Sequence, residues 1–175
     1  MLTSLVITII GPDKPGLVSS FSDKAAAFGA NWEESWMANV AGQFAGIVHL
    51  QVPAAKAEAL VTALRELEAL GLHVAIAHSS GAAVEPSTRL FKLELVGQDR
   101  PGIVRDISRL LADRNISIEE LDTELVSGSW SGENLFQAKA TLRLPATAAI
   151  EELRHALEGL ANELMVDLNL DNTAA

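Results

Sequence analysis

The sequence predicts an α+β fold in which one β-α-β-β-α-β module occurs twice in tandem. The first observation is a motif of the form Gly-x-Asp-x-Pro-Gly at 11–16, which returns at 97–102 with an offset of 86 positions (97 minus 11). The second is that an apolar run precedes each motif and a helical pattern follows it. The third is that the remaining strand and helix patterns recur in the same order. Such self-similarity over a long period indicates homologous modules.

The motif has the residue types of a turn that leads from a strand into a helix. The first glycine permits a positive φ or a close backbone approach. The aspartate is expected to accept hydrogen bonds from the first helical amides, and the proline is expected in the first helical turn. The second glycine has no side chain, so it leaves the space over the start of the helix open. These residues are Gly11, Asp13, Pro15 and Gly16 in the first copy, and Gly97, Asp99, Pro101 and Gly102 in the second.

Two interpretations of this turn remain open at this point. It is either a purely structural connection, or its exposed amides hold an anionic group such as the carboxylate of an amino acid. One isolated motif would not decide between them.

The first module contains four predicted strands and two predicted helices. Short runs rich in apolar and β-branched residues predict strands at 5–10, 32–40, 44–52 and 73–78. Apolar residues at helical spacing predict helices that end at Gly29 and at Gly71, since glycine is a natural residue after a helix. The order strand, helix, strand, strand, helix, strand is that of the ferredoxin-like fold, in which an antiparallel sheet carries both helices on one face.

The second module repeats this order after a short linker. Small and polar residues punctuated by Gly and Pro predict the linker at 81–87, so the modules are expected at 1–80 and 88–171. The prolines that follow the third strands, Pro53 and Pro145, are 92 positions apart, whereas the two turns are 86 positions apart. The second copy therefore contains about six additional residues, which lie in a hairpin around Trp130. Trp130 is expected either to contact a partner or to cover its own sheet. Predicted strands of this copy are 90–96, 117–126, 134–144 and 165–170.

The composition excludes several functional classes. The formal net charge is −10, and no cluster of Lys and Arg suggests a surface for nucleic acid. The chain has no cysteine, so thiolate catalysis and Cys-type zinc sites are excluded. No apolar run is long enough for a membrane span, and the N-terminus does not resemble a signal peptide, so a cytoplasmic protein is expected.

Residues that could support catalysis or bind a metal are scattered. His49, His73, His78 and His155 show no metal-ligand spacing. The pairs Glu33–Glu34 and Glu119–Glu120 occupy matching places, but adjacent strand residues are expected to face opposite sides and not to converge. We therefore expect no enzyme activity, no cofactor and no metal site.

The two turns resemble those of the ACT-domain family, which consists of small regulatory modules that bind amino acids or related metabolites. The resemblance rests on the two motifs, each followed by Leu-Val or Ile-Val, and on the segment 115–118, Asn-Ile-Ser-Ile. It covers nearly the whole chain, as two tandem domains. The segments 32–39 and 41–45 resemble, in particular, a repressor group within this family that controls the glycine cleavage system.

The resemblance implies an amino-acid site at the turns. In the family, ligands lie where two ACT domains meet, so sheets that pair side by side, within the chain or in a homodimer, are expected. The first copy departs from the family pattern because Trp32 is bulky enough to fill a pocket, so the two sites need not be equivalent. The ligand-binding residues implied are Gly11, Asp13, Gly16, Leu17 and Asn31, and Gly97, Asp99, Gly102, Ile103 and Ser117.

Three functions remain open from the sequence. The first is a regulator that binds an amino acid, glycine being one candidate, and represses transcription through a protein partner such as an activator rather than by binding DNA. The second is an amino-acid-sensing accessory subunit that controls a metabolic enzyme in trans. The third is a small enzyme of ferredoxin-like fold, which would require a convergent acid–base cluster.

Overall fold

The computed structural model describes residues 1–79, 88–127 and 134–172. The chain divides into two compact units, Met1–Ala82 and Ala83–Ala175, which we name the first module and the second module. The predicted linker at 81–87 and the loop that contains Trp130 lie outside the described residues, so both remain predictions.

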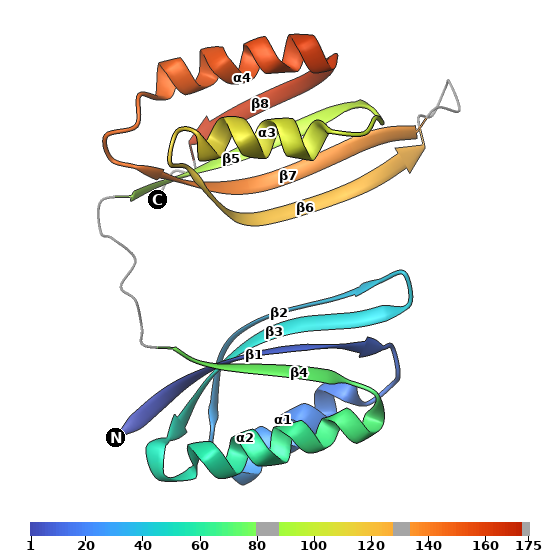
Figure 1. Cartoon of the computed structure of the whole chain (residues 1–175), viewed down its shortest axis with the longest axis vertical. Helices are drawn as coiled ribbons and strands as arrows, with labels where there is room; N and C mark the ends of the chain where they lie inside the picture. Colours follow the sequence, from blue (N-terminus) through green and yellow to red (C-terminus); the bar gives the residue numbers. More distant parts are fainter. Residues whose placement is uncertain (80–87, 128–133, 173–175) are drawn as a thin grey trace. The chain divides into compact units, whose positions relative to one another are not determined.

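The first module has the predicted order of elements, with longer strands than the sequence indicated. Its sheet is antiparallel, in the order β2-β3-β1-β4, and both helices cover one face (Figure 1). The elements are β1 (Leu2–Pro12), α1 (Leu17–Ala27), β2 (Asn31–Val40), β3 (Gln43–Pro53), the 3₁₀ turn η1 (Ala54–Lys56), α2 (Ala57–Arg65), the 3₁₀ turn η2 (Glu66–Leu70) and β4 (His73–Ser79).

The second module repeats this architecture. Its antiparallel sheet has the order β6-β7-β5-β8, and α3 and α4 lie on one face (Figure 1). The elements are β5 (Thr88–Gln98), α3 (Ile103–Ala112), β6 (Ser117–Ser127), β7 (Asn134–Pro145), α4 (Ile150–Leu164) and β8 (Val166–Asn172). The prediction of two tandem ferredoxin-like modules is confirmed.

Each module has its own hydrophobic core between its sheet and its helices. Alternate residues of the central strand β1 (Leu5, Ile7 and Ile9) are fully buried beneath α1 and α2, as the two-residue period of a strand requires. Phe91, Leu93 and Leu95 of β5 do the same in the second module. The core residues of one module therefore come from that module alone.

The helical segments of the first module end at the predicted glycines, although α2 itself ends at Arg65 and continues as the 3₁₀ turn η2. Gly29 follows α1 with φ 69°, and Gly71 follows η2 with φ 89°, a left-handed conformation that glycine adopts at little cost. The second module uses other residues for the same purpose, because Asn115 (φ 55°) follows α3 and Met165 (φ 53°) follows α4.

Candidate ligand site at the duplicated turns

The second glycine of each motif has the backbone conformation that the turn requires. Gly16 has φ 88° and ψ 1°, and Gly102 has φ 104° and ψ −9°. These angles are those of the third residue of a type II turn, for which proline is favoured one position earlier. Each helix begins one residue after this glycine, so Pro15 and Pro101 precede the helices. The expectation that they lie within the first helical turn is therefore wrong.

The aspartate of the motif does not cap the helix. Among the described residues, no side chain caps the N-terminus of α1 or of α3. Asp13 instead accepts a hydrogen bond from Asn39 of β2, with Nδ2 at 2.6 Å from Oδ2, and its amide donates to the carbonyl of Gly42 at 3.1 Å. The predicted capping role is thus wrong for both aspartates, and the carboxylate of Asp13 is engaged by β2 instead.

The first amides of both helices are consequently available to a ligand. The carbonyl of Gly16 accepts the first helical hydrogen bond, from the amide of Ser20 at 2.9 Å, and Gly102 does the same for Asp106. The preceding helical amides have no intrahelical partner, as at any helix start. Such amides and the helix dipole attract anions.

The first glycine of each motif is needed for close approach rather than for its φ. A Cβ atom at Gly11 would lie 2.6 Å from the carbonyl oxygen of Gly71. A Cβ atom at Gly97 would lie 2.8 Å from Cβ of Val166. Because both distances are far below normal contact, Gly11 allows the residues just before β4 to lie against the motif, and Gly97 allows the first residue of β8 to do so.

Asn31 and Ser117 do not lie beside the turn of their own module. Asn31 pairs with Gln51 of β3, whereas Gly11 pairs with Phe44. These two positions on β3 are seven residues apart, which is about 23 Å along a strand. Ser117 begins β6 in the same way. A ligand at the turn can contact Asn31 or Ser117 only if a second sheet supplies that residue.

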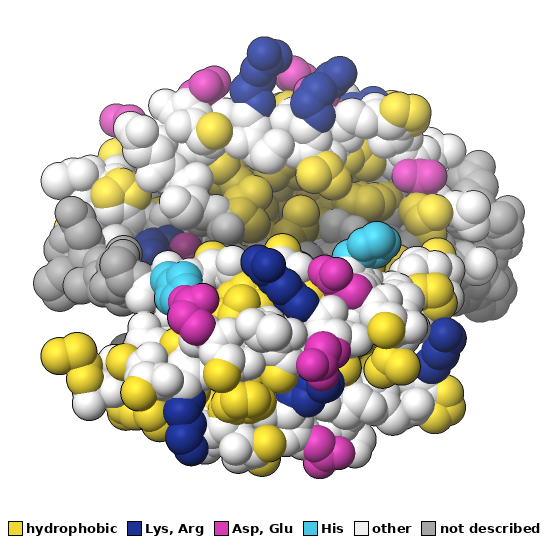
Figure 2. Space-filling view, turned by 60° about the horizontal axis from the view of Figure 1, so that its bottom comes forward, with side chains coloured by type: hydrophobic (Ala, Val, Ile, Leu, Met, Phe, Trp, Pro, Cys, Tyr) yellow, Lys and Arg dark blue, Asp and Glu magenta, His cyan; other side chains and the backbone are white. Residues whose placement is uncertain are grey.

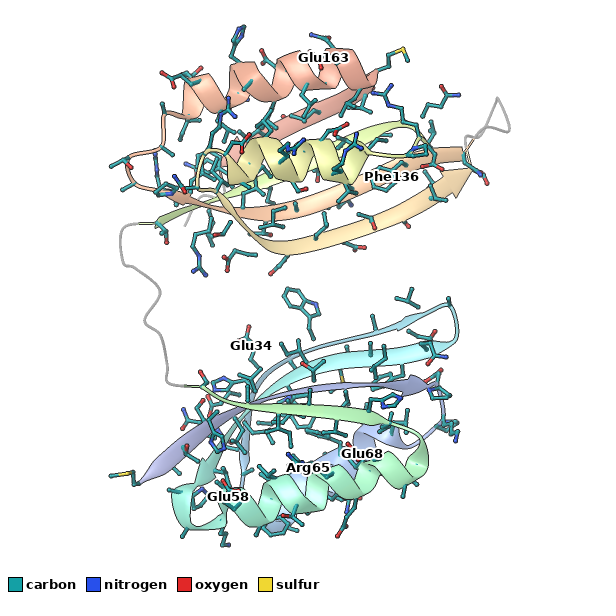
Figure 3. All side chains as sticks on the ribbon, viewed as in Figure 1. Glu34, Glu58, Arg65, Glu68, Phe136 and Glu163 are labelled. Carbon is teal, nitrogen blue, oxygen red and sulfur yellow. The ribbon has the colours of Figure 1, made fainter. Side chains whose placement is uncertain are left out.

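The second module contains an apolar cavity beneath α3. It has a volume of about 30 Å³ and lies between α3 and the strands β6 and β7. Ile103 and Val104, the first two residues of α3, line it, and so does Phe136, which Figure 3 shows on β7 on the side of α3. The cavity therefore begins at the helix start that follows the motif.

Glu119 and Glu120 reach the same face of the sheet, so the expectation that these two neighbours face opposite sides is wrong. A β-bulge follows Ile118, and it lets Glu119 and Glu120 reach side chains on the same face of β7. Glu119 forms an ion pair with Arg143, and Glu120 accepts a hydrogen bond from Thr141 at 3.2 Å. Both carboxylates are thus engaged in joining the two strands.

The structure also shows a polar contact that the sequence did not predict. Ser4 and His49 are hydrogen-bonded through Oγ and Nε2, and Glu34 lies opposite His49 on β2, pointing away from the helices (Figure 3). Ser4 and His49 are 45 positions apart, so the sequence carries no local signal of their contact. The contact lies on the other face of the sheet from α1 and at the end remote from the motif.

Basic and acidic side chains are interspersed on the surface that Figure 2 shows. Near the second motif, a hydrogen bond from Arg105 lowers the pKa of Asp106, with smaller contributions from the charges of Arg100 and Arg109.

Within the described ranges, no group of His, Asp and Glu has an arrangement that could hold a metal ion. The helices described are also too short or too polar to cross a membrane.

Comparison with known proteins assigns the two modules to one family. Models of the ACT domain match residues 3–77 and, separately, residues 92–128. The chain belongs to the ACT-domain family. Each ACT domain contains the same strand–turn–helix arrangement, and this family membership supports a regulatory, amino-acid-sensing role.

Two solved structures are similar to this tandem ACT protein over its whole length. The crystal structure of an unknown protein from Galdieria sulphuraria is 31% identical, with a TM-score of 0.88, and covers 99% of this chain and 100% of its own. A protein assigned as a glycine cleavage system transcriptional repressor is 19% identical, with a TM-score of 0.71, and covers 100% of this chain and 99% of its own. No curated protein matches the sequence.

Proposed function

We propose that this protein is a regulator that binds an amino acid at one or both of its duplicated turns and acts through a protein partner. The observation that carries the proposal is the start of α1 and α3. In both ACT domains a positive-φ glycine leads into a helix whose first amides have no side-chain cap among the described residues. This arrangement favours a carboxylate, which is the group that all amino acids share.

The proposed partner is a DNA-binding activator rather than DNA itself. The chain carries a formal net charge of −10, and DNA binding depends on neutralising phosphates with Lys and Arg. The tandem fold is shared with the protein assigned as a glycine cleavage system transcriptional repressor, which supports a role in transcription. An acidic regulator can repress by binding an activator, with the amino acid changing that affinity.

The amino acid is proposed to bind between two paired sheets. In an antiparallel pairing along the edge strands β2 or β6, the first residue of one strand lies beside the last residues of the other. Asn31 or Ser117 of a second copy would then approach the turn that includes Asp13 or Asp99. Exposed strand edges provide the backbone groups for such a pairing, so a homodimer is part of this proposal.

The binding step is tested by thermal unfolding of the full chain with each common amino acid, glycine and serine included. A ligand that binds only the folded state stabilises it by about 2.7 kcal/mol at a hundredfold excess over Kd. We expect a rise in Tm that at least one of Gly16→Val and Gly102→Val abolishes. Gly29→Val is the matched control, because Gly29 also has a positive φ (69°) but lies at the other end of α1. If no amino acid raises Tm, amino-acid binding is refuted.

The partner step is tested separately. The purified protein should not shift operator DNA alone, and it should retain a DNA-binding activator in a pull-down to an extent that depends on the amino acid. Because such coupling is reciprocal, the activator should change the affinity for the amino acid by the same factor. Retention of a metabolic enzyme instead would favour the accessory-subunit function, and a direct shift of DNA would refute the proposal.

A further inference from the structure

The two ACT domains differ in the space beneath their first helix. In the first module, Phe21 of α1 and Trp32 of β2 pack edge to face, with ring centroids 5.4 Å apart and planes at 81°. The offset of 86 places Ile107 and Ile118 at these two positions in the second module. Both isoleucines line the cavity beneath α3. Two aromatic rings thus fill in the first module the place that two smaller side chains leave open in the second.

A second pair of corresponding positions also leaves more space in the second module than in the first. In the first module Met37 reaches so far across the sheet that a Cβ atom at Gly46 would lie 2.8 Å from its Cγ. The corresponding residues of the second module are Thr123 and Ala138, and Ala138 lines the cavity. The open space is therefore a consequence of several substitutions and not of one side-chain rotamer.

The cavity is suited to an aliphatic group. Its volume of about 30 Å³ exceeds the roughly 10–15 Å³ that one buried water needs, but aliphatic side chains and Phe136 dominate its lining. Three of the lining residues are also large hydrophobic residues exposed to solvent, namely Val104 (42%), Ile118 (36%) and Leu121 (48%). A small aliphatic group would therefore gain apolar contacts there, and a polar group would lose its hydrogen bonds to water.

The aspartate of the motif also differs between the modules. Asp13 is engaged by Asn39, whereas the residue that corresponds to Asn39 in the second module is Leu125. No side chain of the described ranges donates a hydrogen bond to the carboxylate of Asp99 in the structure. Its backbone amide bonds to Asn134, two residues along β7 from Phe136. Asp99 can thus accept the ammonium group of a ligand near one end of the cavity.

We propose that the second module is the ligand-binding one, and that its ligand is an amino acid with a small aliphatic side chain rather than glycine. This inference rests on the proposed function and names the ligand class of the site. The aliphatic side chain enters the cavity beneath α3, and Asp99 binds the ammonium group. The first module, filled by Trp32 and with Asp13 engaged, serves a structural role.

The test compares valine, threonine and glycine as ligands of the full chain by isothermal titration calorimetry. Valine and threonine have the same shape, but threonine has a hydroxyl group in place of one methyl group. We expect valine to bind at least about tenfold more tightly than threonine, since apolar pockets discriminate valine from threonine by up to roughly 100-fold. Glycine, with no side chain to occupy the cavity, should bind more weakly than valine.

Four variants assign the binding to one module. Ile118→Trp introduces the residue that fills the first module, and Trp32→Ile is the reciprocal control. Asp99→Asn removes the proposed ammonium partner without altering the cavity, and Asp13→Asn is its control. We expect Ile118→Trp and Asp99→Asn each to weaken valine binding at least about tenfold, and both controls to leave it within about twofold of the original chain.

The outcomes separate the inference from the proposed function. If no amino acid binds, the proposed function fails and the inference fails with it. If an amino acid binds but threonine or glycine equals valine, or if Trp32→Ile or Asp13→Asn abolishes binding, this inference alone is overturned. Should Ile118→Trp not fold, the valine-to-threonine ratio and Asp99→Asn still decide the question.

Discussion

Replacing Phe21 by alanine should destabilise the first module and leave the stability of the second unchanged. The side chain of Phe21 is fully buried and packs against Trp32. Removal of a buried phenylalanine side chain costs about 3–5 kcal/mol. Since a domain of this size loses about 4–8 °C of Tm per kcal/mol, the unfolding transition of the first module should fall by at least about 12 °C. The core of the second module contains no residue of the first, so its transition should not move.

Scanning calorimetry measures both transitions, and amide NMR spectra assign them to modules. Val18→Ala on the same helix is the control, because Val18 is 43% exposed and its removal should cost less than about 1 kcal/mol. The reasoning is refuted if signals of the second module disappear at the same lowered temperature as those of the first. The two cores would then form one cooperative unit, and the predicted domain division would be wrong.

Four further substitutions test the turns and the helix that follows the second one. Gly16→Ala should destabilise the first module by about 1–3 kcal/mol in urea unfolding, because alanine is strained at a φ of 88°. The added Cβ atom would meet nothing within 4 Å, so no clash contributes to this cost. An unchanged urea midpoint would contradict this prediction. Gly97→Ala should destabilise the second module through a clash with Val166, and Val166→Ala should restore part of the loss; additive effects would exclude the clash. Because the hydrogen bond from Arg105 lowers the pKa of Asp106, its stabilising effect exists above the ordinary pKa near 3.8 and is lost as the pH falls below that value. Asp106→Asn should therefore differ in stability from the original chain at pH 7 and converge with it in acid, and a difference that persists in acid would refute this.

The fold could be predicted from the sequence because its signals are local and duplicated. The apolar alternation of 5–10 and the helical stripe that begins at Leu17 depend only on near neighbours, and β1 and α1 follow them. Gly29 and Gly71 marked the ends of the first module's helices for the same reason. The identical order of elements in the second copy made the ferredoxin-like assignment independent of any single segment.

Features that depend on strand register could not be predicted in this way. The bulge that brings Glu119 and Glu120 to one face arises from pairing between β6 and β7. The bond between Asn39 and Asp13 also crosses from one element to another, so local capping preferences gave the wrong partner. The bulk of Trp32 did indicate that the two turns have different surroundings. The cavity beneath α3 could not be predicted, because residues of α3 and of several strands line it together.

The central claim is that an amino acid binds at the start of α3 in the second module. The most direct measurement is a titration of the full ¹⁵N-labelled chain with valine, followed by amide NMR. We predict saturable shifts of the amide signals of Ile103 and Val104, with those of Leu17 and Val18 unchanged. Shifts confined to Leu17 and Val18, or no saturable shift at either helix start, would contradict the account.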